Sequence, residues 1–168
     1  MRGDQDARGL RVPRCAGCAA VAVTILAAAC ASGGAWEGTP ADPAWVTFAP
    51  ELAVDLSAMT RTPSGLYYQD LAPGVGAQAH RNSLVWIHYV TWLSDGTLVD
   101  TSIGGEPFQF RLGGNEVIRG WNQGIPGMKI GGRRKLVVRP GLAYGSRGSA
   151  KVPPNATLVF EVQLVDVR

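Results

Sequence analysis

The sequence predicts an α+β fold in which an antiparallel β-sheet packs around one short α-helix. Two observations support this prediction. Several segments alternate apolar and polar residues with a period of two, as half-buried strands do, and turn-forming residues separate them. Only the stretch 115–134 has helix-like apolar spacing, and Gly and Pro interrupt it every few residues. Residues 62–168 are numerous enough to bury a core of their own.

The expected elements follow in order from about Thr62. A strand is predicted in 65–74, where a Pro-Gly pair closes it. Residues 83–100 predict a long strand, a turn at Asp95-Gly96 and a short return strand. Further strands are expected in 106–114, 133–140 and 156–168, and the last one places Leu158, Phe160, Val162 and Leu164 on a single face.

Residues 1–30 have the layout of a secretory signal peptide, with an Arg-bearing start, an apolar run and small residues before Cys30. The run is shorter than the about 20 apolar residues that span a bilayer. Cys30 resembles the lipidated cysteine of bacterial lipoproteins, although Ala27 occupies the usual leucine position and Leu26 precedes it. We expect an exported protein of the cell envelope or periplasm, anchored to a membrane through Cys30. Ordinary cleavage nearby is the alternative.

Residues 31–61 are predicted to form a flexible tether or N-terminal extension, because Gly, Ala and Pro dominate their first half. The segment 46–65 is more apolar, and docking on the domain is open, since its periodicity does not decide. Trp86 and Trp92 share a strand face opposite Tyr89. They are expected to pack under the segment 44–59, and an exposed aromatic patch that recruits a partner is the alternative.

Charge and motifs exclude several functions. Four Arg against two Asp in the leader supply +2 of the formal net charge of +3, so we expect no nucleic-acid partner. The basic run Gly132–Lys135 is expected to lie on a solvated strand edge. All three cysteines lie in the leader, and metal, cofactor and nucleophile motifs are absent downstream. Asp100 is a candidate general base that lacks a paired group. We therefore expect no metal and no cofactor.

Four strings, VWIHYV, LVDTS, GGNEVIRGWNQGIPGMKIGGRRKLVV and LAYGSRG followed by VPPNATLVFEVQLVDV, resemble FKBP-type peptidyl-prolyl cis–trans isomerases. The resemblance covers about Thr62 to Arg168 and implies a half-barrel sheet around the helix. It also implies a proline-binding cleft whose floor is the Trp121 indole. It assigns catalytic roles to Asp100, to the Ile118 backbone N–H and to the Tyr144 hydroxyl. The substrate-binding residues that it implies are Tyr89, Val99, Phe108, Glu116, Val117, Trp121, Val152 and Phe160.

The same resemblance implies a function in the folding of exported proteins. The expected partners are proline-containing unfolded or exported polypeptides, and macrolide immunosuppressants are a second expected ligand class. Two departures favour an alternative, a proline-binding or chaperone module with weak turnover. The family usually has Phe where this chain has Val99, and residues 103–107 lack the Arg that often pairs with the family's Asp. Asp100 is then expected to accept the Tyr89 hydroxyl or to remain solvated.

Overall fold

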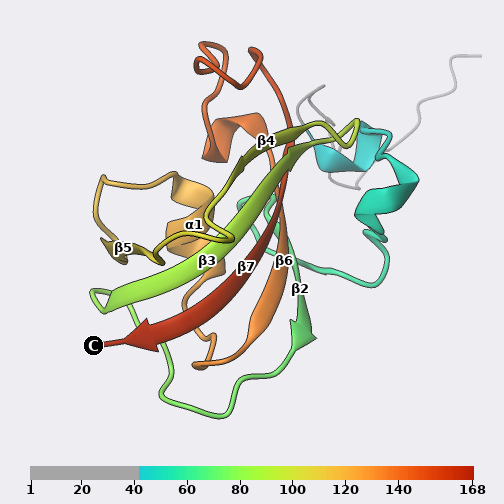
Figure 1. Cartoon of the computed structure of the whole chain (residues 1–168). Helices are drawn as coiled ribbons and strands as arrows, with labels where there is room; N and C mark the ends of the chain where they lie inside the picture. The colour runs from blue at the N-terminus through green and yellow to red at the C-terminus, as the bar shows by residue number, and fades with distance from the viewer. Residues whose placement is uncertain (1–41) are drawn as a thin grey trace, which may run out of the picture. The chain divides into compact units, whose positions relative to one another are not determined.

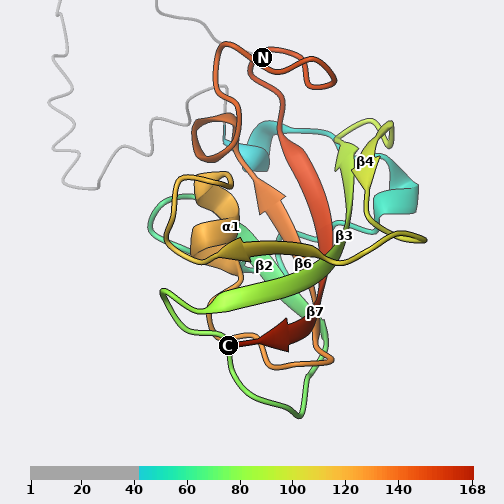
Figure 2. The same cartoon turned by 60° about the vertical axis from the view of Figure 1, so that its left-hand side comes forward.

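The structure, a computed structural model, describes residues 42–168 as a seven-stranded sheet with one α-helix. The sheet order is β1-β2-β6-β7-β3-β4, every pairing is antiparallel, and β5 also pairs with β3. Figures 1 and 2 show α1 against one face of this curved sheet and the segment 42–59 on its other side. The predicted antiparallel α+β fold is therefore confirmed.

Strands β2 to β7 lie inside the predicted strand ranges to within one residue, and α1 lies inside the predicted stretch 115–134, whereas β1 and the 3-10 helices were not predicted. The strands are β1 (Thr60–Arg61), β2 (Tyr67–Ala72), β3 (Leu84–Leu93), β4 (Leu98–Thr101), β5 (Phe108–Arg111), β6 (Arg133–Val138) and β7 (Leu158–Val167). The single α-helix is α1 (Arg119–Gly124). Three short 3-10 helices are also present: η1 (Pro43–Trp45), η2 (Pro50–Leu52) and η3 (Pro140–Leu142). In the described part of the chain, no helix is long and apolar enough to cross a membrane.

The main core lies between α1 and the sheet. Its fully buried members include Ile87 of β3, Leu136 of β6 and Leu158 of β7, whose neighbours along each strand point to the opposite face of the sheet. Two glycines of α1 make this packing close, because a Cβ at Gly120 would lie 2.5 Å from Val138 Cγ1. A Cβ at Gly124 would lie 2.7 Å from a Leu136 methyl. The broken, Gly-rich helix is thus suited to lie directly on β6.

A second apolar cluster occupies the opposite face of the sheet. Leu52 and Met59 are buried there with Tyr67, Val137 and Val159. Trp92 and Phe48 pack against the same cluster. Residues 42–59, which belong to the predicted tether or N-terminal extension, therefore form a docked extension. Docking of the segment 46–65 was left open by the sequence, and residues 48–59 do pack here because their apolar side chains cover this sheet face.

Of the two tryptophans expected to pack under the segment 44–59, Trp92 does so and Trp86 does not. The Arg168 guanidinium lies over the Trp86 ring, with its Cζ 5.1 Å from the ring centroid. Trp86 is not part of the second cluster. Trp45 is 74% exposed and also lies outside that cluster. The predicted signal peptide, Cys30 and the tether residues 31–41 lie outside the described residues.

The basic run was wrongly expected on a solvated edge. β6 lies between β2 and β7, and its Arg134 and Lys135 are both buried. Arg134 donates to Asp70 at 2.7 Å and to the Gly124 carbonyl, at the end of α1, also at 2.7 Å. Intramolecular acceptors therefore satisfy this cation.

Candidate active site

A cleft of about 390 Å³ opens beside α1, between the helix and strands β3, β4 and β5. This volume is within the range of small-molecule and peptide side-chain pockets. The residues that line it are Tyr89, Thr91, Val99, Asp100, Phe108, Asn115, Glu116, Val117, Ile118, Trp121, Tyr144 and Phe160. All the predicted catalytic and substrate-binding residues line this cleft except Val152. That side chain is buried in the main core, where the Ser149–Val152 bridge holds it.

Trp121 forms the aromatic centre of the cleft. It lies on α1 and is only 6% exposed. Four rings surround its indole, and their centroids lie 5.0 to 6.1 Å from it: Tyr89, Phe108, Phe110 and Phe160. Three of these contacts are edge-to-face, which is a favourable geometry for aromatic pairs. The indole is therefore held in one orientation at the aromatic base of the cleft.

The start of α1 presents a free backbone donor to the cleft. Ile118 is the N-cap, with φ −60° and ψ 151°, and its carbonyl accepts from Trp121 N–H at 3.1 Å. Among the described residues, its own N–H has no acceptor, as expected at a helix start. The loop before it is fixed by Asn122, whose side chain accepts from Gly113 N–H and donates to Gly114 carbonyl, each at 2.7 Å. This donor can accordingly bind a substrate carbonyl.

The opposite wall is built by β4. The register pairs Thr91 with Asp100 and Trp92 with Leu98, so Val99 is the extra residue of a β-bulge. Bulges often redirect side chains beside functional sites. Val99 is half-buried and lines the cleft. A valine at a β-bulge therefore occupies the wall position at which the family that this chain resembles usually has Phe.

Asp100 is paired with Tyr89 across the strands. The Tyr89 hydroxyl donates to Asp100 Oδ2 at 2.7 Å. Burial, reinforced by this hydrogen bond, raises the pKa of Tyr89 to about 12. Tyr89 therefore remains a neutral donor at neutral pH. Lys151 Nζ lies 3.8 Å from Asp100 Oδ1, so a lysine from a different loop stands near the carboxylate that lacks the family's usual Arg.

Two further polar side chains at the cleft, Glu116 and Tyr144, have different surroundings. The Glu116 carboxylate accepts from Arg111 N–H at 3.1 Å, so it ties the loop before α1 to β5. Tyr144 is 44% exposed at the cleft. The sequence-based prediction missed Thr91 and Asn115. Thr91 follows Tyr89 by two residues on β3 and so shares its face, which was a usable signal; Asn115 lies in a loop without such a pattern.

Comparison with known proteins agrees with this geometry. Residues 76–165 match the model of the family described as FKBP-type peptidyl-prolyl cis–trans isomerase. The FK506-binding protein of Neisseria meningitidis serogroup B is 43% identical over 105 residues, which is 61% of this chain and 96% of that protein. FK506-binding protein 4 of Rhizopus delemar is 44% identical over 111 residues, 66% of this chain. The chain spans only 29% of that longer relative.

Solved structures lead to the same family. FkpA from Escherichia coli superposes with a TM-score of 0.63 and 40% identity, covering 71% of this chain and 55% of FkpA. AtFKBP13 gives a TM-score of 0.61 and 38% identity, covering 66% of this chain and 98% of that one. Family match, sequence identity and fold thus coincide on the part of the chain that builds the cleft, and the chain belongs to the FKBP-type peptidyl-prolyl cis–trans isomerases, a family of enzymes.

Proposed function

We propose that this chain accelerates rotation about X–Pro bonds in exported polypeptides by binding the proline ring in the cleft over Trp121. The observation that carries the proposal is the indole enclosed by four rings, bordered by the free Ile118 N–H and the Tyr144 hydroxyl. An apolar floor suits a pyrrolidine ring. The two donors suit the carbonyl groups of the adjacent peptide.

The chemistry requires no bond breaking. The barrier to rotation about the peptide bond is about 18–20 kcal/mol and arises from its partial double-bond character. Uncatalysed exchange of an X–Pro bond therefore takes tens to hundreds of seconds. A twisted amide is less polar than a planar one, so a cleft that excludes water favours the transition state over the ground state. Donors that fix the flanking carbonyls hold the substrate in the twisted geometry.

The remaining parts of the proposal concern partners and place. The clients are unfolded or exported chains that display proline, and macrolides of the FK506 type are ligands of the same cleft. The proposed location is the cell envelope, with a lipid on Cys30 as membrane anchor. The support is the leader's apolar run, which ends in small residues before Cys30. Mass spectrometry of the mature N-terminus tests this part, because an unmodified N-terminus elsewhere contradicts it.

A protease-coupled assay on Ala-X-Pro-Phe peptides tests the activity. We expect the purified chain to accelerate cis-to-trans conversion and Trp121→Leu to lose most of that acceleration. Trp45→Leu is the matched control, because Trp45 is 74% exposed and lies outside the cleft. Thermal melts of each variant separate loss of the site from loss of the fold. Peptide binding without any acceleration would contradict the proposed enzyme activity and favour the alternative, a proline-binding module.

A further inference from the structure

The cleft wall that carries Val99 and Asp100 stands on an edge of the sheet. β4 comes last in the strand order and pairs with β3. The bulge at Val99 interrupts even this pairing. A bulged edge strand is bent and incompletely paired. Its position therefore depends on what holds the turn between β3 and β4.

The docked N-terminal extension, residues 42–59, contacts that turn directly. Ala49 N–H donates to the Ser94 carbonyl at 2.8 Å. The Glu51 carboxylate lies against Gly96, where a Cβ would overlap it and would approach Ala49 Cβ to 3.3 Å. Gly96 has φ +89°, a conformation that favours glycine. The turn and the extension thus fit together closely.

The extension is in turn fixed to the centre of the sheet. Leu52 is buried in the second apolar cluster. The Lys135 ammonium donates to the Leu52 carbonyl, and its distance to the Ala53 carbonyl is 3.4 Å. Lys135 also pairs with Glu161 of β7 at 3.3 Å. Because β6 and β7 are central strands, this anchor is rigid compared with β4.

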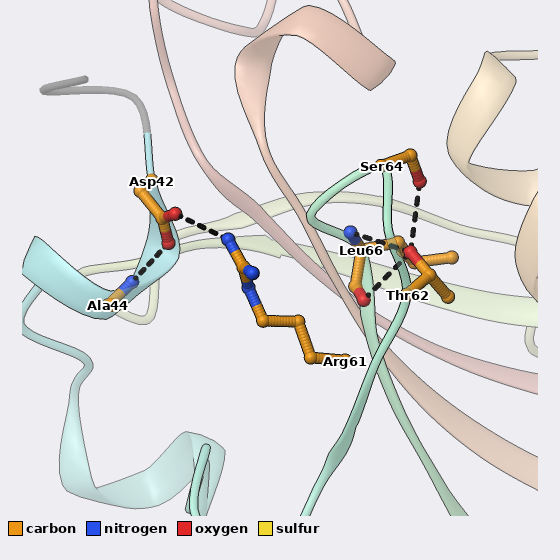
Figure 3. Close-up of polar contacts among 6 residues, drawn as sticks. All are labelled: Asp42, Ala44, Arg61, Thr62, Ser64 and Leu66. Atoms are coloured by element: carbon orange, nitrogen blue, oxygen red, sulfur yellow. Dashed lines mark hydrogen bonds and ion pairs between the residues drawn. The ribbon is translucent and has the colours of Figure 1, made fainter. Parts of the chain in front are cut away.

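The beginning of the extension has its own attachment. Figure 3 shows Asp42 accepting from the Arg61 guanidinium at 2.9 Å, while its other oxygen accepts from Ala44 N–H at 3.0 Å. Beside it, the Thr62 hydroxyl and the Leu66 backbone bond to each other, which fixes the turn that follows β1. The extension is therefore held at its start and at Leu52, and between Phe48 and Leu52 it reaches the turn of β3 and β4.

We propose that the docked extension positions the active-site wall: it clamps the Ser94–Gly96 turn to the sheet centre and thereby sets where Val99 and Asp100 stand in the cleft. The inference rests on the proposed isomerase function. Ala49 is its key positioning residue, acting through β4 without touching substrate. The extension precedes residues 76–165, which match the family model, so this side of the clamp lies outside that match.

Ala49→Pro in the full chain tests the clamp at its backbone hydrogen bond to the turn. Ala49 has φ −61° and ψ 138°, which proline adopts without strain. The substitution removes the N–H that bonds Ser94 and places ring atoms against that carbonyl. Ala49→Ser is the matched control, because it keeps the N–H. The readouts are kcat/KM on the Ala-X-Pro-Phe series and amide hydrogen exchange of β4, with β6 and β7 as internal references.

We expect Ala49→Pro to lower kcat/KM about three- to tenfold and to speed exchange in β4 alone, as loss of a positioning contact would. Ala49→Ser should match the parent chain in both. Unchanged kcat/KM in Ala49→Pro overturns the inference, and so does faster exchange throughout β6 and β7, which would indicate global destabilisation. If the parent chain shows no acceleration, the proposed function fails. Hydrogen exchange of β4 then decides the clamp independently.

Discussion

A substitution at Gly120 tests the close packing of α1 against β6, on which the position of Trp121 depends. The change Gly120→Ala adds a methyl group that would lie 2.5 Å from Val138 Cγ1 and 3.0 Å from Cγ2. Favourable carbon–carbon contacts begin near about 3.5 Å, so helix or strand must move by about 1 Å. Such overpacking costs about 1–3 kcal/mol. Alanine recovers at most about 1 kcal/mol through helix propensity.

We therefore expect Gly120→Ala to lower the free energy of unfolding by about 1–2 kcal/mol. Because Trp121 is the next residue, kcat/KM for proline peptides should fall as well, by about tenfold if the shift approaches 1 Å. Denaturant unfolding and the protease-coupled assay measure the two effects. Gly141→Ala is the control, since its Cβ would meet nothing closer than 3.8 Å.

A second substitution checks the cause. Val138→Ala removes the two methyl groups that the new side chain would strike, although alone it should cost about 2 kcal/mol in lost burial. In the double variant, the two changes should compensate each other by about 1–2 kcal/mol in a double-mutant cycle. A Gly120→Ala chain with parental stability and activity, or a double variant in which the two losses simply add, would refute this account of the packing.

Three further predictions follow from the same geometry. Val99→Phe restores a ring to the cleft wall and should raise kcat/KM roughly two- to fivefold, the effect of about 0.5–1 kcal/mol of aromatic contact; an unchanged value contradicts it. Since the pKa of Tyr89 is raised to about 12 from 10.0, its contribution to stability is complete below pH 10 and is lost as pH rises to about 12. Thermal melts should show this loss, and Tyr89→Phe should lessen it. Leu52→Ala should cost about 2–5 kcal/mol in denaturant unfolding. Trp45→Ala, at a 74% exposed site, should cost less than about 0.5 kcal/mol; equal losses would contradict docking of the extension.

The sequence predicted the sheet well because its strands carry local patterns. Alternation along β7 and the Asp95-Gly96 turn are signals within a few residues, and the structure places both as expected. The cleft residues were assigned through the family resemblance, and their roles remain predictions. Val152 does not line the cleft, because the loop before the double proline folds back through the Ser149–Val152 bridge and buries this side chain in the core. No local periodicity encodes that fold-back.

The basic run shows the limit of local patterns most clearly. Composition marks Arg134 and Lys135 as surface residues, but strand order decides burial, and their acceptors lie far along the chain. Asp70 is 64 residues from Arg134, and Leu52 is 83 residues from Lys135. Neighbouring residues of a strand point to opposite faces. Arg134 therefore holds the end of α1 on the cleft side, while Lys135 holds the extension on the other.

This alternation gives β6 a coupling role between the two faces of the sheet. The residue that fixes α1, and with it Trp121, is adjacent to the residue that fixes the extension, and with it the turn before Val99. Both α1 and the extension are thus hydrogen-bonded to a single central strand, β6. Buried cations with satisfied acceptors tolerate little displacement, because a lost partner leaves a charge unpaired in the interior. If the clamp proposal holds, the separation of Trp121 from Val99 across the cleft depends on these two neighbouring cations, so losing either buried cation should alter it.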